Sequence, residues 1–185
     1  MEHLQPARES AEYAELVAEV FVETVRKAAT KAMHCEYGDE EITPSLMECL
    51  QYSYLHGASP IREIACGLEV TVSAASQLVD RLVRKGLATR RESKSDRRQT
   101  EVELTPAGAE LVKQMRQRRL QWFERIVGEM PESRRGSFLD GLESFLKVAL
   151  AGEQNLDRAC SRCAITHAPF CVVNRLKAER SGTER

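Results

Sequence analysis

Apolar residues recur at three- and four-residue spacing over residues 9–36, which predicts a long amphipathic helix with an acidic outer face. Its apolar positions are Tyr13, Leu16, Val17, Val20, Phe21, Thr24 and Ala28. The same spacing returns over residues 106–130 and 131–150. Long helices are therefore predicted near both ends of the chain.

Three shorter helices are predicted between these ends, at residues 44–56, 60–68 and 71–86. A hydroxyl residue followed by proline opens the first two, which is the usual pairing of an N-cap with a first-turn proline. Thr71 or Ser73 is expected to cap the third helix.

The apolar period becomes two after the third helix, which predicts short strands at residues 87–91 and 100–104 joined by a polar turn. A lone two-stranded hairpin is marginal in water, so it must lean on the helices. The expected fold is mainly α with a small two-stranded β wing. This is a winged helix-turn-helix with dimerisation helices from both ends of the chain.

The net charge of −1 hides an uneven distribution along the sequence. Residues 1–70 carry 5 basic and 13 acidic side chains, residues 71–100 carry 8 and 3, and residues 101–185 carry 14 and 12. Positive potential is focused on the third short helix and the hairpin, as expected of a local phosphate-binding surface.

The helix predicted at residues 71–86 has the dimensions of a DNA-reading element, about 24 Å long and about 10 Å across. It fits a major groove that is about 12 Å wide. The residues expected to dock on the domain are Val72, Ala75, Leu78, Val79, Leu82 and Val83. The predicted contacts to base edges or phosphates are Thr71, Ser73, Ala74, Gln77 and Arg81.

The turn between the strands carries Lys94, Arg97 and Arg98. A long cationic side chain on a narrow loop can enter the minor groove, whose negative potential holds it. Asp96 would be repelled by phosphate, so we expect it to fix an arginine, either Arg98 or Arg81.

Three stretches of this region resemble one known family. They read Val79-Asp-Arg-Leu-Val-Arg-Lys-Gly-Leu-Ala-Thr-Arg90, Ser95-Asp-Arg-Arg-Gln99 and Leu104-Thr-Pro-Ala-Gly-Ala-Glu-Leu111, and are similar to the multiple antibiotic resistance regulator (MarR) family of transcription factors. The resemblance covers residues 10–150 and implies a homodimer with intertwined outer helices. It also implies that helix 71–86 enters the major groove and the hairpin enters the minor groove. Arg98 would then be the minor-groove residue, Asp96 its support and Arg97 a phosphate contact.

Apolar helix faces at both ends of the chain also favour a homodimer, and a monomer that packs these helices on one another is the alternative. Two-fold symmetry sets the reading helices about 34 Å apart and predicts a near-palindromic operator. The expected organisation is an N-terminal dimerisation helix (1–38), a winged helix-turn-helix DNA-binding unit (39–105), C-terminal dimerisation helices (106–151) and a cysteine-containing tail (152–185).

The tail carries a cysteine cluster with the spacing C-x2-C-x3-H-x3-C, formed by Cys160, Cys163, His167 and Cys171. These four residues could complete a tetrahedral zinc site. Alternatively, the three thiolates could hold an iron–sulfur cluster. The fourth ligand would then be Cys35, Cys49 or Cys66, although Cys49 and Cys66 are otherwise expected to be packing residues. A metal-free thiol switch, and a tail with no cofactor or function, are the remaining alternatives.

The sequence predicts a cytoplasmic transcription regulator, most simply a repressor, whose operator affinity responds to a ligand, to redox state or to the tail's metal or iron–sulfur centre. The resemblance to the MarR family further implies a small aromatic acid as an effector, and Tyr52, Tyr54 and His56 could line its pocket. No phosphate-binding glycine loop, nucleophile–base pair or apolar run of about 20 residues is found, so neither an enzyme nor a membrane protein is expected. The alternatives are a metal-binding or protein-docking winged-helix module without DNA binding, and the dimerisation part of an enzyme.

Overall fold

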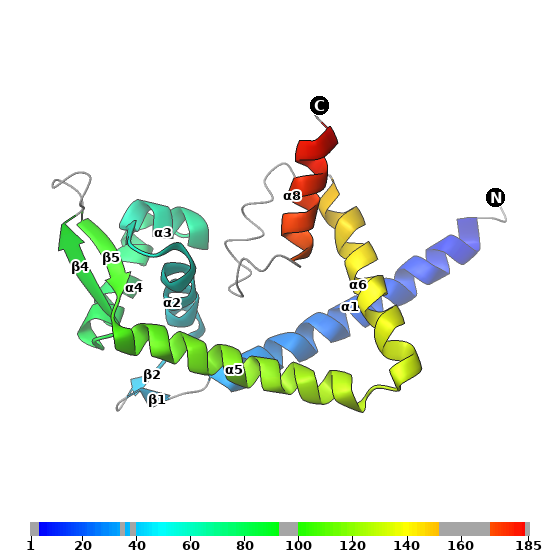
Figure 1. Cartoon of the computed structure of the whole chain (residues 1–185), viewed down its shortest axis with the longest axis horizontal. Coiled ribbons are helices and arrows are strands. Elements are labelled where there is room, and N and C mark those ends of the chain that lie inside the picture. The colour runs from blue at the N-terminus through cyan, green and yellow to red at the C-terminus, as the bar shows by residue number, and fades with distance from the viewer. Residues whose placement is uncertain (1–3, 34–35, 38–39, 93–99, 152–170, 184–185) are drawn as a thin grey trace.

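The computed structural model describes residues 4–33, 36–37, 40–92, 100–151 and 171–183. In chain order, the elements are α1 (Leu4–Met33), β1 (Glu36–Tyr37), β2 (Glu40–Glu41), α2 (Pro44–His56), β3 (Ser59–Pro60), α3 (Ile61–Leu68), α4 (Val72–Arg84), β4 (Ala88–Glu92), β5 (Thr100–Leu104), α5 (Pro106–Glu129), α6 (Glu132–Ala151) and α8 (Val172–Thr183). Figure 1 shows α2, α3, α4 and the β4–β5 hairpin gathered at one end, from which α5 runs to the other end and meets α6. This mainly helical architecture with a small sheet confirms the predicted fold class.

Helices α2, α4 and α5 begin in the same way, with a threonine in extended backbone conformation whose hydroxyl accepts a hydrogen bond from the amide three residues later. The acceptor and donor residues are Thr43 and Leu46 (3.4 Å), Thr71 and Ala74 (3.1 Å), and Thr105 and Gly108 (3.1 Å). Such a bond satisfies an amide that has no partner within the helix. Thr71, rather than Ser73, therefore caps α4.

The sheet at the winged end has three strands instead of the predicted two, in the antiparallel order β3-β5-β4. β4 and β5 pair along their full length, which confirms the predicted hairpin. The additional strand pairs Ser59 with Val102, where the sequence pattern had suggested a helix start. Because proline has no amide hydrogen, Pro60 is tolerated at a sheet edge, and α3 begins one residue later.

The hydrophobic core lies within the winged end. Its fully buried side chains come from α2, α3, α4, β5 and the first turns of α5, and include Leu46, Leu50, Ile64, Val79, Leu82, Val102 and Val112. On α5 the buried residues end at Met115. A bilayer-spanning apolar stretch is absent from the helices that the structure describes.

Two residues that were expected to dock on the domain do not do so. Val72 and Val83, at opposite ends of α4, are 50% and 37% exposed, whereas Ala75, Val79 and Leu82 are fully buried. A helix that projects beyond the core buries its middle turns only, so the apolar stripe overestimates what is covered at both ends.

The apolar faces of α1 and α6 are exposed in the single chain. The most exposed large side chains are Tyr13 (70%), Leu16 (61%), Val20 (60%), Phe145 (63%) and Val148 (79%). An edge-to-face contact between Phe21 and Phe138, with ring centroids 6.3 Å apart, links the two helices. The described residues of α6 nevertheless include no buried side chain, so this contact covers little of either apolar face.

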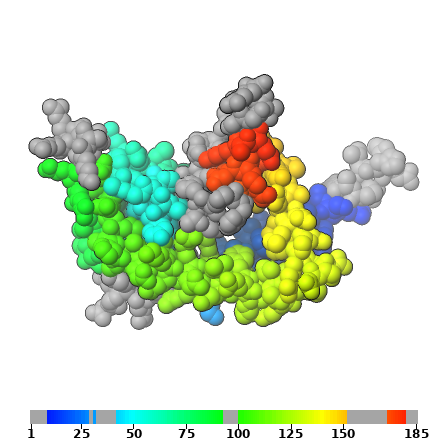
Figure 2. Space-filling model, in the orientation of Figure 1, coloured from blue at the N-terminus to red at the C-terminus, as the bar shows by residue number. Residues whose placement is uncertain are grey.

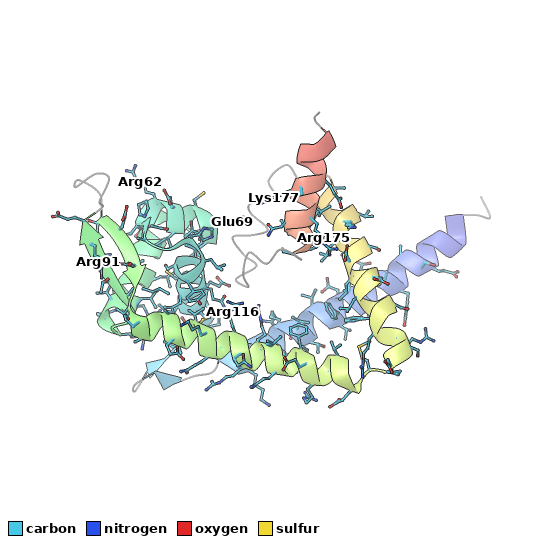
Figure 3. All side chains as sticks on the ribbon, viewed as in Figure 1. Arg62, Glu69, Arg91, Arg116, Arg175 and Lys177 are labelled. Carbon is cyan, nitrogen blue, oxygen red and sulfur yellow. The ribbon has the colours of Figure 1, made fainter. Side chains whose placement is uncertain are left out.

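The tail contains a helix that the sequence pattern did not predict. α8 packs against α6, as Figure 2 shows for the red and yellow segments. Val173 and Leu176 are buried there, with Leu150 and Cys171 packed against them. Figure 3 shows Arg175 at the same contact, where its guanidinium lies 2.7 Å from the Glu143 carboxylate.

A close backbone approach joins the wing to α5. The Thr105 amide donates to the Leu87 carbonyl at 3.0 Å, and the Thr105 hydroxyl donates to the Gly86 carbonyl at 2.7 Å. A Cβ at Gly108 would lie 2.1 Å from the Leu87 oxygen, which leaves room for glycine alone. Gly86 itself has a φ of 68°, which favours glycine at this turn.

We expect Gly108→Ala to lower the free energy of unfolding by about 1–3 kcal/mol, because the new methyl group forces the strand and the helix apart. The matched control is Gly128→Ala in the same helix, where an added Cβ meets nothing within 4 Å. That variant should gain about 0.5–1 kcal/mol from helix propensity. Thermal or urea unfolding measures both, and equal effects would contradict the close approach.

Candidate nucleic-acid interface

The candidate interface is the face of α4 that points away from the core. Ser73, Gln77, Asp80 and Arg84 are all exposed, and their spacing of four, three and four residues places them on one stripe. Thr71 is exposed at the tip of the helix. Of the remaining predicted contacts, Ala74 and Arg81 are half-buried on the flanks of this stripe.

The stripe is polar at its leading end and charged toward its far end. Because amides of a first helical turn favour anions, the leading end is suited to a phosphate or a base edge. Arg84 supplies a cation further along. Arg90 and Arg91 of β4 are two exposed arginines of the wing, and they lie on opposite faces of the strand because successive strand side chains alternate. Figure 3 shows Arg91 on this strand.

An ion pair that sequence reasoning missed crosses from this helix to the wing. The Arg90 guanidinium lies 2.8 Å from the Asp80 carboxylate and donates to the Ser76 hydroxyl at 3.4 Å. Both charged groups are partly exposed, so the pair contributes at most about 1 kcal/mol. Its effect is positional, because it neutralises the carboxylate on the exposed stripe and holds β4 against α4. The signal in the sequence was Asp80 itself, which is the only acidic residue of α4.

The predicted residues at the tip of the wing, Lys94, Asp96, Arg97 and Arg98, lie outside the described residues. That Asp96 holds the side chain of Arg98 or Arg81 in place therefore remains a prediction. The structure does describe the base of the wing, where Glu92 pairs with Thr100. A second ion pair there joins Arg91 to Glu103 across the strands at 2.8 Å.

The predicted metal ligands are described only in part. Cys160, Cys163 and His167 lie outside the described residues, as does Cys35, whereas Cys171 is half-buried directly before α8. Within the described ranges, no group of three or more His, Cys, Asp or Glu side chains is arranged to hold a metal ion. Cys49, Cys66 and Cys171 are free thiols.

Cys49 and Cys66 occupy opposite environments. Cys49 is fully buried in the core, as expected of a packing residue, and burial raises the pKa of its thiol to about 12. It is therefore a poor fourth ligand, since metals bind the thiolate. Cys66 was also expected to pack, but it is exposed on α3.

The aromatic residues expected around an effector are mostly packing residues. Tyr52 is 7% exposed, and its ring stacks on His56 with centroids 4.3 Å apart. Burial raises the pKa of the Tyr52 hydroxyl, with smaller contributions from Glu63 and Cys66. Tyr54 packs against the core. A separate depression of about 380 Å³ lies along α5, lined by Lys113, Arg116, Gln117, Arg119, Leu120 and Phe123.

The α3–α4 pair followed by the β4–β5 hairpin defines a winged helix-turn-helix domain. Residues 42–100 match the sequence model of the MarR family. No curated protein sequence matches the chain.

Several solved structures are similar to this one. MepR, a transcription regulator of the Staphylococcus aureus multidrug efflux pump MepA, has 25% identity and a TM-score of 0.62, over 74% of this chain and 98% of its own. A transcriptional regulator from Thermotoga maritima has 24% identity and a TM-score of 0.63, over 78% and 99%. FabT from Streptococcus pneumoniae, solved in complex with DNA, has 18% identity and a TM-score of 0.60, over 76% and 96%. The chain thus shares its fold with these proteins.

We expect alkylation by iodoacetamide to distinguish the two helical cysteines. In the native protein Cys66 should be modified and Cys49 protected, even at pH 9, where a thiol with the ordinary pKa of 9.0 is half ionised. Cys49 becomes reactive only after unfolding in guanidinium. Peptide mass spectrometry measures each site, and equal native labelling would contradict the burial of Cys49.

Proposed function

We propose that this protein is a homodimeric transcription regulator that binds duplex DNA through α4 and the wing. The observation that carries the proposal is the exposed stripe of α4, which runs from Ser73 to Arg84 with Arg90 of the wing beside it, within a winged helix domain. The contacts are those predicted from the sequence. Thr71, Ser73, Ala74, Gln77 and Arg81 lie in or beside the major groove, and Lys94, Arg97 and Arg98 reach the minor groove with Asp96 in support. The DNA complex of the similarly folded FabT favours the same partner.

A second copy of the chain is the proposed cover for the apolar faces of α1 and α6. Soluble monomers rarely expose a contiguous apolar patch of more than a few hundred Å². Here both helices expose aromatic and aliphatic side chains in register with their helical repeat. Segments 1–38 and 106–151 are accordingly proposed as dimerisation helices, and 39–105 as the DNA-binding unit.

Two-fold symmetry determines the form of the DNA site. A dimer places two α4 helices against one face of the duplex, about 34 Å apart, and therefore favours a near-palindromic operator. Repression is the simplest outcome, since a dimer bound over a promoter excludes polymerase.

We propose that the tail regulates this binding through a metal or redox centre at Cys160, Cys163, His167 and Cys171. Zinc suits all four residues, whereas an iron–sulfur cluster would use the three thiolates. The contact between α8 and α6 supports a route for the signal. It packs Cys171 near Leu150, and the Arg175–Glu143 ion pair holds the same two helices together. A change at this contact would reach the dimerisation helix directly.

An aromatic or other amphipathic acid is a second proposed effector. The depression along α5 combines three cationic side chains with Leu120 and Phe123, so it suits a carboxylate with an apolar body better than the packed Tyr52 does. Because α5 connects the DNA-binding unit to α6, a ligand bound in this depression would lie between the DNA-binding unit and the proposed dimer contact.

We expect Arg98→Ala to weaken binding to promoter DNA upstream of the protein's own gene by about 5- to 150-fold, as for loss of a specific groove contact. Arg125→Ala is the control, since it removes an equal charge from an exposed ion pair with Glu129 on the far part of α5. Mobility shift measures binding, and light scattering checks that both variants remain dimeric. Equal affinity of the two variants would refute the wing contact. Failure of the wild type to bind DNA would instead favour a docking module.

Protein purified without oxygen should carry the tail's centre. Metal analysis and acid-labile sulfide then distinguish zinc from an iron–sulfur cluster, and the latter absorbs visible light. Cys160→Ser with Cys163→Ser should abolish the bound metal, whereas Cys49→Ala should retain it because the Cys49 thiol is buried in the core. A colourless wild-type protein without iron or zinc would contradict a metal centre and leave the thiol switch.

A further inference from the structure

The structure describes every residue of the first turn of α4. Within that turn, Val72 is the only large apolar side chain that is exposed. It is 50% exposed and directly follows the capping residue Thr71. The other large apolar side chains of α4 are buried or half-buried, apart from Val83 at the opposite end. Val72 is therefore not part of the core, although its spacing suggested that it was.

The neighbours of Val72 make this turn a mixed polar and apolar surface. The Thr71 hydroxyl is engaged by the Ala74 amide, so it is committed to capping the helix. Ser73 and Gln77 are exposed and carry hydrogen-bonding groups. Val70, on the other side of Thr71 in the chain, is 40% exposed.

The major groove offers one apolar group to such a surface, which is the C5-methyl group of thymine. The other base-edge groups in that groove are hydrogen-bond donors and acceptors. A valine placed against those groups would remove water from them and return no hydrogen bond. Against a thymine methyl, the same side chain buries two apolar groups at once.

We propose that Val72 reads a thymine C5-methyl group in each half of the operator, an inference that rests on the proposed DNA-binding function. The first turn of a reading helix is the part that reaches the base edges. Valine suits this role because its branched side chain has one strongly preferred rotamer in a helix, so little freedom is lost on contact. Val72 is thus a specificity residue, and the neighbouring polar stripe supplies the hydrogen bonds.

The test removes the methyl group from the DNA rather than from the protein. The operator is first located by footprinting with the full-length dimer, and each thymine is then replaced singly by deoxyuridine. At one symmetric position per half-site, this change should weaken wild-type binding about fourfold, the value of one buried methyl group at about 0.8 kcal/mol. Replacing both positions should weaken binding about fifteenfold.

The variant Val72→Ala should lose this sensitivity at that position and keep the wild-type response at every other one. Val72→Thr retains the side-chain shape but keeps only one of the two methyl groups of valine. It shows whether that one methyl group is enough to distinguish thymine from uracil. Val83→Ala is the matched control, because it shortens the other exposed valine of the same helix and should keep the wild-type profile. Thermal unfolding of each variant confirms that it is folded.

Two outcomes would overturn the inference while leaving the proposed function intact. One is a wild-type protein that binds its operator equally well with uracil at every thymine. The other is a Val72→Ala protein with the wild-type deoxyuridine profile. A wild-type dimer that binds no duplex at all would overturn the proposed function together with this inference.

Discussion

The contact between the Leu87 carbonyl and the first turn of α5 is the constraint on which the rest of the arrangement depends. Gly86 turns the chain out of α4, Leu87 begins the wing, and Thr105 and Gly108 bring the long helix back against the same backbone atoms. The end of α4, the start of the wing and the first turn of α5 therefore meet at one set of backbone contacts.

Much of the fold follows from local signals in the sequence. Three helices begin directly after Thr43, Thr71 and Thr105, and each threonine hydroxyl accepts a capping hydrogen bond from the amide three residues later. The change of apolar spacing after Gly86 predicts the two strands of the hairpin. These features are predictable because a cap or a strand alternation depends on residues a few positions apart.

The features that sequence reasoning missed depend on tertiary contacts. Ser59 joins the sheet only because Val102 lies beside it, and Arg90 becomes part of the candidate site only because β4 crosses near Asp80. α8 has few apolar residues, so its helix shows little periodicity and is stabilised by packing on α6. Val72 and Cys66 have the right spacing to be buried, but none of the elements that the structure describes covers them.

The end of the core at Met115 has a consequence for how the molecule assembles. The winged end has its own packed interior, whereas the apolar faces of α1 and α6 would be covered only in the proposed dimer. Dilution should therefore affect the two parts unequally, because mass action stabilises only what the partner covers. At low cellular abundance the main species would be a chain with a folded winged end and incompletely packed α1 and α6. The expression level itself would then tune occupancy of the proposed DNA site.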